Sequence, residues 1–165
     1  MNYKKLNIKK KPIVVAVSGG FDPLHIGHVR IFKQAKKLGD KLIVILNNDN
    51  WLKKKKGYVF MSQHERKELI EAIKYVDEVV LTSHTKNTKD RSVCNELEKI
   101  MPHIFANGGD RKHDNVPEVS VCESIGCKMV FNIGEGGKIQ SSSWLVDAFK
   151  AEGQNYCVAG KKGKK

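Results

Sequence analysis

Length, composition and charge narrow the class of protein. The chain has 165 residues, 40% of them hydrophobic, and 30 Lys and Arg against 18 Asp and Glu give a formal net charge of +12. A chain of this length forms one domain that buries about 70% of its unfolded surface, which excludes a multidomain polymerase or synthetase. No apolar run approaches the roughly 18 residues of a membrane span. The basic start leads into a short apolar run that falls below the ~7–15 residues of a signal-peptide core.

Between the two ends, short apolar runs alternate with helical patterns. Residues 13–17 form a continuous apolar run typical of a buried parallel strand, and a Gly/Pro/His loop and a helix to about residue 38 follow. A second strand over 42–46 leads into a polar, Lys-rich loop that runs to residue 58. The motif Ser62-x-x-Glu65 is a capping box that opens the next helix. The later elements are expected as strands at 79–81, 103–106 and 128–133, and as helices at about 90–100, within 116–125, and from 141–143 to about 151.

Five strand–helix units in a row predict an α/β fold: a doubly wound, five-stranded parallel sheet in a single domain with helices on both faces. In such sheets, ligands bind beyond the carboxyl ends of the strands, where the strand order reverses. Each of the loops 18–28, 47–58, 107–115 and 133–143 follows a predicted strand, so we expect the functional site there.

Most of the positive charge lies at the two ends. Residues 1–11 contain five lysines and residues 158–165 contain four, which leaves +3 for the body. Such ends are usually solvated tails that bind polyanions weakly. We therefore expect a basic tail over 1–11, a domain over 12–152 and a basic tail over 153–165.

The four cysteines lack CxxC spacing, and a chain of this size does not depend on disulfide bonds. We predict reduced thiols in a cytoplasmic protein. Membrane proteins, collagen-like chains and disulfide scaffolds are excluded.

The most informative segment is SGGFDPLHIGH, residues 18–28, which follows the first strand and enters a helix. His25 and His28 fall on one face of a first helical turn, where unpaired N–H groups and the helix dipole favour an anion. Gly27 lets a phosphate approach the backbone, while Gly19 and Gly20 allow a sharp turn. Two imidazoles over a polyphosphate can stabilise the charge that develops during group transfer. The alternatives are a pair of core histidines or half of a metal site, but no carboxylate or Cys stands at ligand spacing, so we expect no protein metal site.

The stretch GGFDPLHIGHVRIFKQAKKLGDKLIV resembles the G-x-F-D-x-x-H-x-G-H signature of the cytidylyltransferase-like nucleotidyltransferases. This family includes glycerol-3-phosphate cytidylyltransferase, heptose-phosphate adenylyltransferase and the archaeal FAD synthetases. The resemblance runs from about residue 12 to 148 and is strongest over 14–82. It implies a Rossmann-like fold and transfer of a nucleotidyl group from an NTP to a phosphorylated small molecule, with release of pyrophosphate.

The resemblance also implies roles for individual residues. The catalytic residues would be His25, His28, the phosphate-binding Lys56 and Arg66, whose side chain would reach the phosphates. Nucleotide-binding residues would be Gly19, Gly20, Phe21, Asp22, Gly27, Gly109, Asp110, Ser141, Ser142 and Ser143. The three serines would form a second phosphate cradle facing the histidine helix. The alternatives are a solvated loop for Lys53–Lys56, an exposed helix charge for Arg66 and simple N-capping for the serines.

The expected reaction is a direct in-line displacement by the acceptor's phosphate. A Mg²⁺ ion held mainly through the nucleotide phosphates is expected as cofactor. The partners would be CTP or ATP and a phosphorylated acceptor, and the residues neither support nor exclude a homodimer.

We favour transfer of CMP to an acceptor such as glycerol 3-phosphate. The alternatives are adenylyl transfer to heptose 1-phosphate or FMN, and a basic-tailed nucleic-acid-binding module on an inactive fold. Glycerol-phosphate cytidylyltransferases carry RTEGIST where this chain has residues 136–142, so the Arg of that segment is missing and Lys138 is the residue that could replace its charge. The loop 110–118 aligns with no acceptor loop of the family.

Overall fold

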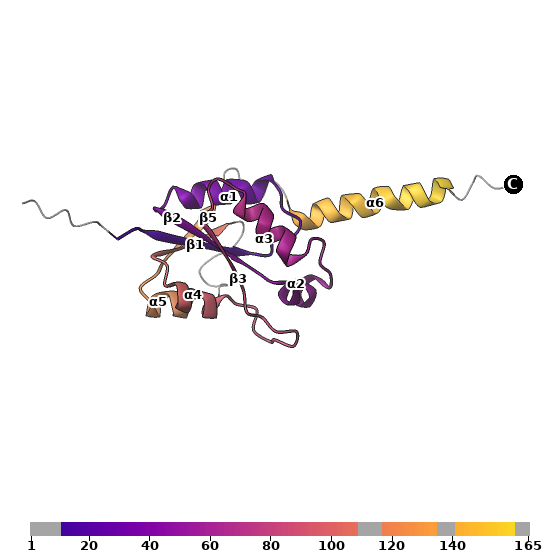
Figure 1. Cartoon of the computed structure of the whole chain (residues 1–165). Coiled ribbons are helices and arrows are strands. Elements are labelled where there is room, and N and C mark those ends of the chain that lie inside the picture. The colour runs from indigo at the N-terminus through magenta and orange to yellow at the C-terminus, as the bar shows by residue number, and fades with distance from the viewer. Residues whose placement is uncertain (1–10, 109–116, 135–140, 161–165) are drawn as a thin grey trace, which may run out of the picture.

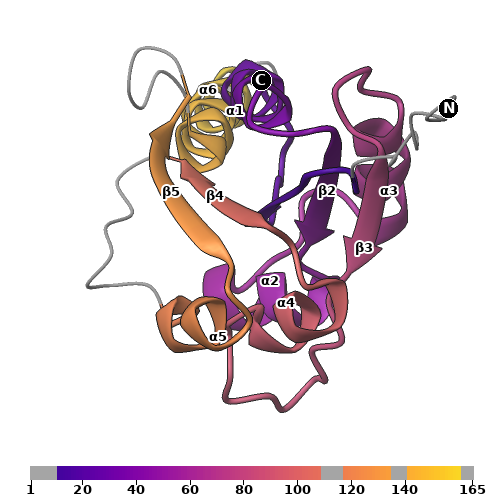
Figure 2. The ribbon, with the colours of Figure 1, turned by 90° about the vertical axis from the view of Figure 1, so that its left-hand side faces the viewer.

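The computed structural model of the chain describes residues 11–108, 117–134 and 141–160. In this part of the chain the predicted strands form as β1 (Val14–Gly19), β2 (Lys41–Leu46), β3 (Glu78–Leu81), β4 (Ile104–Gly108) and β5 (Lys128–Ile133). The strand pairs are parallel and run in the order β3-β2-β1-β4-β5. The order therefore reverses between β1 and β4 (Figure 2), which confirms the predicted doubly wound, five-stranded parallel sheet.

Helices cover both faces of this sheet (Figures 1 and 2). Helices α1 (Ile26–Lys36) and α3 (Gln63–Glu71) lie on one face, and α4 (Cys94–Ile100) and α5 (Val119–Ser124) lie on the other. Each of these helices runs back along the sheet, as parallel strands require. The single α/β domain is thereby confirmed.

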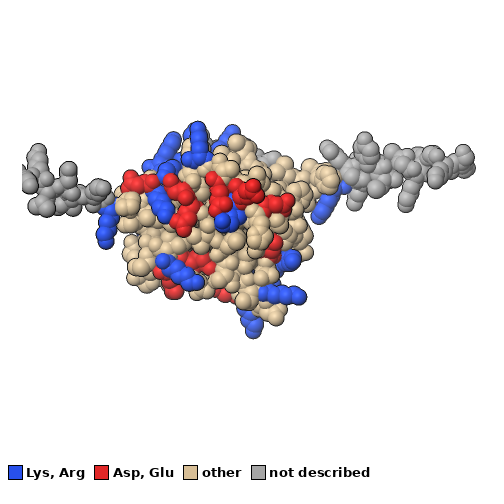
Figure 3. Space-filling view, viewed as in Figure 1, with Lys and Arg blue, Asp and Glu red and all other residues tan. Residues whose placement is uncertain are grey.

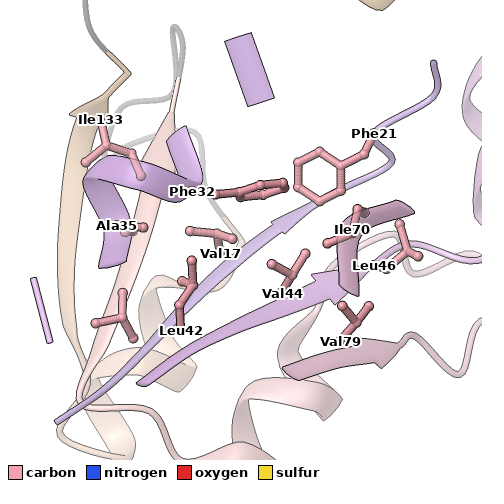
Figure 4. Close-up of a cluster of buried hydrophobic side chains, with 12 residues drawn as sticks. Val17, Phe21, Phe32, Ala35, Leu42, Val44, Leu46, Ile70, Val79 and Ile133 are labelled. Carbon is pink, nitrogen blue, oxygen red and sulfur yellow. The ribbon is translucent and has the colours of Figure 1, made fainter. Parts of the chain in front are cut away.

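The alternation of side chains along the strands divides the core into two clusters. Val15 and Val17 of β1 face α1 and α3, whereas Ala16 between them faces α4 and α5. In the first cluster, Phe32 of α1 and Ile70 of α3 are fully buried over the strands (Figure 4). Because both faces of β1 and β2 are buried, these strands read as continuous apolar runs rather than as alternating patterns.

One prediction of secondary structure was wrong. The segment expected as a Lys-rich loop up to residue 58 contains helix α2 (Asp49–Lys56). Asn48 caps it by accepting the N–H of Trp51 at 3.0 Å, and Gly57 ends it in the left-handed conformation. The helix buries two side chains, Trp51 and Leu52, and its lysines occupy the remaining surface. A segment with so narrow an apolar face lacks the periodicity that indicates a helix.

The helix α6 (Ser142–Gly160) runs away from the body of the domain (Figure 1). It continues past the expected end near residue 151 and into the segment 153–165 that was assigned to the C-terminal tail. The boundaries of the two tails stay predictions. Among the described residues, none of the helices has the length and apolar character needed to cross a membrane.

Candidate active site

The candidate site lies at the carboxyl ends of β1 and β4, where the strand order reverses. A cavity of about 160 Å³ opens there between the end of β1, the first turns of α1 and the end of β4. It is lined by residues 17–21, His28, Ile31 and residues 106–108. Of the loops expected to carry the site, the one after β1 contributes most of this lining.

His25 and His28 open helix α1 as a reciprocal cap. The Nδ1 atom of His25 accepts the backbone N–H of Gly27 at 3.1 Å, and Nδ1 of His28 accepts the N–H of His25 at 3.3 Å. The two rings stack with their centroids 3.7 Å apart and their planes 23° apart. The histidines replace the Ser and Glu of an ordinary capping box and satisfy two of the N–H groups that a helix leaves open at its start.

This arrangement fixes the protonation of both rings. A neutral imidazole that accepts a hydrogen bond at Nδ1 carries its proton on Nε2. Burial, the adjacent His25 and the charge of Lys56 lower the pKa of His28 to about 3. Burial and Lys56 also lower the pKa of His25. At neutral pH the pair therefore presents two Nε2–H donors.

Gly27 stands between the two histidines in the first turn of α1. Its backbone N–H is not open to a phosphate, because the ring of His25 already takes it. An anion at this helix start would meet the Nε2–H groups of the rings in the place of that amide.

Lys56, the last residue of α2, lies beside the two histidines. Its Nζ donates a hydrogen bond to the backbone oxygen of Asp22 at 2.7 Å. Burial is the largest cause that lowers the pKa of its ammonium group, and the charge of Arg66 adds to the effect, while Asp22 opposes it. Lys56 is half-buried, so the alternative of a solvated loop does not describe it. The structure thus brings together three of the predicted catalytic residues, from the start of α1 and the end of α2.

The glycines before the motif make room for buried side chains. A Cβ on Gly19 would stand 2.7 Å from the ring of Phe21, and one on Gly20 would stand 2.8 Å from Leu52. Phe21 adopts a positive φ of 49°, and its ring packs edge-on against His28 with centroids 4.9 Å apart. Gly19 therefore leaves room for the ring of Phe21, which packs against His28. Both glycines and Phe21 line the cavity.

Asp22 is fully buried and holds a neighbouring loop. Its two carboxylate oxygens accept the backbone N–H groups of Phe60 and Met61 at 2.9 and 2.7 Å. In this structure Asp22 fixes the loop between α2 and α3 against the loop after β1.

Arg66 lies buried among the loops next to the candidate site. Its side chain is fully buried, so the interpretation as an exposed helix charge was wrong. The guanidinium donates to the backbone oxygens of Gly20, Asn47 and Met61 and to the carboxylate of Asp49. These bonds, 2.6 to 3.0 Å long, tie together the loops after β1 and β2 and the start of α3. Arg66 is here a positioning residue for the loop that carries the histidines.

The serines at the start of α6 approach the same loop. Ser142 donates its hydroxyl to the backbone oxygen of Pro23 at 2.9 Å, while the hydroxyls of Ser141 and Ser143 lie 2.7 Å from each other. The predicted proximity of this helix start to the histidine loop is therefore present, and Ser142 makes the contact. Gly109, Asp110 and Lys138 lie outside the described residues.

Two polar residues that line the cavity, Ser18 and Asn107, were not predicted as site residues, although the loops 18–28 and 107–115 contain them. Both stand at or next to the carboxyl end of a strand flanking the reversal point, Ser18 on β1 and Asn107 on β4. The strand ends were therefore the signal that could have found them.

A parallel sheet with a histidine-capped helix at its reversal point defines a Rossmann-like α/β protein whose candidate site lies at the carboxyl ends of the strands. The model of the family described as cytidylyltransferase-like matches residues 16–131. The chain belongs to this family and is a nucleotidyltransferase.

Two relatives and one solved structure show the range of the similarity. The FAD synthase of Thermococcus sibiricus is 41% identical over 108 residues, which cover 64% of this chain and 69% of that protein. The ethanolamine-phosphate cytidylyltransferase of Arabidopsis thaliana is 30% identical over 121 residues, covering 72% of this chain and 29% of that protein. The crystal structure of the lipopolysaccharide core biosynthesis protein of Thermoplasma volcanium matches with a TM-score of 0.59 and 28% identity, over 74% of this chain and 98% of that one.

Proposed function

We propose that this enzyme transfers the adenylyl group of ATP to the phosphate of FMN, forming FAD and pyrophosphate. The observation that carries the proposal is the 41% identity to an FAD synthase, which spans most of that relative's length. This reverses the preference drawn from the sequence, which placed CMP transfer to glycerol 3-phosphate first and FMN among the alternatives.

The reaction needs alignment of two anions more than acid–base chemistry. An oxygen of the FMN phosphate, mostly dianionic above its second pKa of about 6, attacks the α-phosphorus of ATP. A new P–O bond forms as the bond to the bridging oxygen breaks, and pyrophosphate leaves with the electron pair. The barrier falls when both reactants are held in line and when donors meet the charge on the equatorial and leaving oxygens.

The residues of the site supply these donors. The Nε2–H groups of His25 and His28 would donate to the α- and β-phosphates, and the ammonium of Lys56 would neutralise the departing pyrophosphate. Neutral imidazoles suit this role, because they donate a proton in a hydrogen bond without needing to gain one first. Gly109 and Asp110 would contact the base or acceptor, and Ser141, Ser142 and Ser143 would bind phosphate oxygens from the start of α6.

Mg²⁺ would enter as part of the nucleotide substrate, where it neutralises phosphate charge. The donor set fits an ion held by phosphates, because no group of three His, Cys, Asp or Glu side chains within the described ranges could hold a metal. A cytoplasmic location is supported by the free thiols of Cys94, Cys122 and Cys127. The homodimer and the weak binding of polyanions by the Lys-rich ends stay predictions.

A second candidate is cytidylyl transfer. The description of the matching family and the similarity to a plant cytidylyltransferase favour it. Both reactions would use the same histidines and lysine, and they differ in the base and acceptor contacts.

The test is a grid of substrates with the full chain and Mg²⁺. ATP and CTP are each combined with FMN, glycerol 3-phosphate and heptose 1-phosphate, and released pyrophosphate and the mass of the product are measured. The proposal expects FAD from ATP and FMN, at a rate far above every other pair. Release with CTP and glycerol 3-phosphate alone would establish the second candidate. If no pair of substrates releases pyrophosphate and neither nucleotide binds, the result would favour the nucleic-acid-binding module.

A further inference from the structure

A basic surface extends from the candidate site across α2 and the loop after β3. The segments 49–56 and 83–92 contain seven Lys and Arg but two acids, Asp49 and Asp90. Asp49 is bound by the buried Arg66, and Asp90 accepts the N–H and hydroxyl of Ser92. Basic side chains gather over α2 and this loop in Figure 3. We call the exposed residues Lys53, Lys54, Lys86, Lys89 and Arg91 the α2 basic surface.

The two segments form one continuous structure. Trp51 of α2 donates its indole N–H to the backbone oxygen of Arg91 at 2.8 Å, and Asn50 donates to that of His84 at 3.0 Å. The ring of His84 closes the loop through Thr82 and Ser92. These hydrogen bonds therefore hold the lysines of the helix and those of the loop next to each other. Both segments follow the carboxyl ends of strands, which is the side of the sheet that carries the site.

At the amino ends of the strands, lysines are paired with acids. There, Lys36 pairs with Asp77 and Lys41 with Glu78, each at 2.6 Å. Within residues 11–108, 117–134 and 141–160, no acid lies within 4.0 Å of a nitrogen of the α2 basic surface. Among the described residues, the charges of the α2 basic surface therefore have no ion-pair partner within 4.0 Å. This surface leads to Lys56, which lies one helical turn from Lys53.

We propose that the α2 basic surface steers the nucleoside triphosphate into the site. The inference rests on the proposed nucleotidyl transfer, because it requires a polyanionic small substrate. Uncompensated charge beside a cleft raises the rate of association by about 10- to 1,000-fold and acts within a Debye length of about 10 Å at 0.1 M salt. The surface acts on association alone, since its side chains do not enter the cavity.

The test measures association of N-methylanthraniloyl-ATP by stopped-flow fluorescence. In the variant, Lys53, Lys54, Lys86 and Lys89 are each replaced by Gln. The control replaces Lys33, Lys37, Lys99 and Lys128, four exposed lysines near the amino ends of the strands, by Gln as well. Both variants lose the same net charge.

We expect the association rate constant of the first variant to fall about 10-fold at ~20 mM salt. The difference should vanish near ~0.5 M salt, where the Debye length is about 4 Å. The dissociation rate constant and the control variant should stay within about 2-fold of the natural chain, because the contacts in the site are unchanged.

Equal association rates in the two variants would overturn the steering proposal and leave the proposed function intact. So would an unchanged rate for the nucleotide together with lost binding of single-stranded RNA, which would assign the surface to nucleic acid. Failure of the natural chain to bind the nucleotide at all would overturn both proposals.

Discussion

The rings of His25 and His28 stack 3.7 Å apart, and each accepts a backbone N–H at Nδ1. The first turn of α1 thus sets which nitrogen of each histidine remains available for a substrate. Helix capping and the protonation of the two rings are consequently coupled, because the same hydrogen bonds that start the helix place a proton on each Nε2.

The lowered pKa of His28 predicts that stability decreases in mild acid. The pKa is about 3 in the folded state against 6.5 in the unfolded chain, so the unfolded state binds the proton first. Stability should therefore fall as the pH drops below about 6.5, by about 1–2 kcal/mol between pH 7 and pH 5 from this group. Urea unfolding at the two pH values measures it. In His28→Asn, whose amide oxygen can still accept the N–H of His25, this part of the pH dependence should disappear.

Arg66→Lys separates a positioning role from direct phosphate binding. A lysine cannot reproduce four hydrogen bonds to three loops, and it leaves buried carbonyl groups unpaired. We expect a loss of about 2–4 kcal/mol in the free energy of unfolding. The control Lys67→Gln removes an exposed pair with Glu71 and should change it by less than about 0.5 kcal/mol. Unchanged stability of Arg66→Lys with strongly reduced activity would point to phosphate contact instead.

The strands and the histidine pair could be predicted from the sequence because the signal of each lies within a short segment. Continuous apolar runs mark strands buried on two faces, and the spacing of His25 and His28 falls on a first helical turn. The burial of Arg66 was not predicted, because its partners come from residues 20, 47 and 49 and from Met61, a set that only the folded chain brings together. Helix α2 was missed for a related reason: the burial of Trp51 depends on the loop after β3, where its indole finds Arg91.

Gly20→Ala tests whether this glycine serves packing. The added Cβ would approach Leu52 Cδ2 to 2.8 Å, so the variant should lose about 1–3 kcal/mol of stability. Leu52→Val removes that atom, and the double variant should be less destabilised than the sum of the single changes. Additive effects in the double-mutant cycle would contradict the steric explanation.

Lys56→Gln tests the proposed contact with the leaving pyrophosphate. Loss of one charge beside the histidines should lower kcat/KM by about 100-fold, since a fixed donor to developing charge contributes about that much. Steady-state pyrophosphate release with ATP and FMN measures it. Lys33→Gln, on the exposed face of α1, serves as the matched control and should stay near the natural rate. A similar modest decrease of kcat/KM in both variants would show that Lys56 does not contact the leaving pyrophosphate.

In the proposed reaction, the Nε2–H groups of the histidine pair stabilise the charge that moves during transfer. The most direct test is the rate of FAD formation from ATP and FMN in single turnovers of the natural chain, His25→Ala and His28→Ala. We expect a decrease of about 100-fold or more in each variant, with nucleotide affinity changed far less. Formation of FAD by His28→Ala at the rate of the natural chain would contradict it.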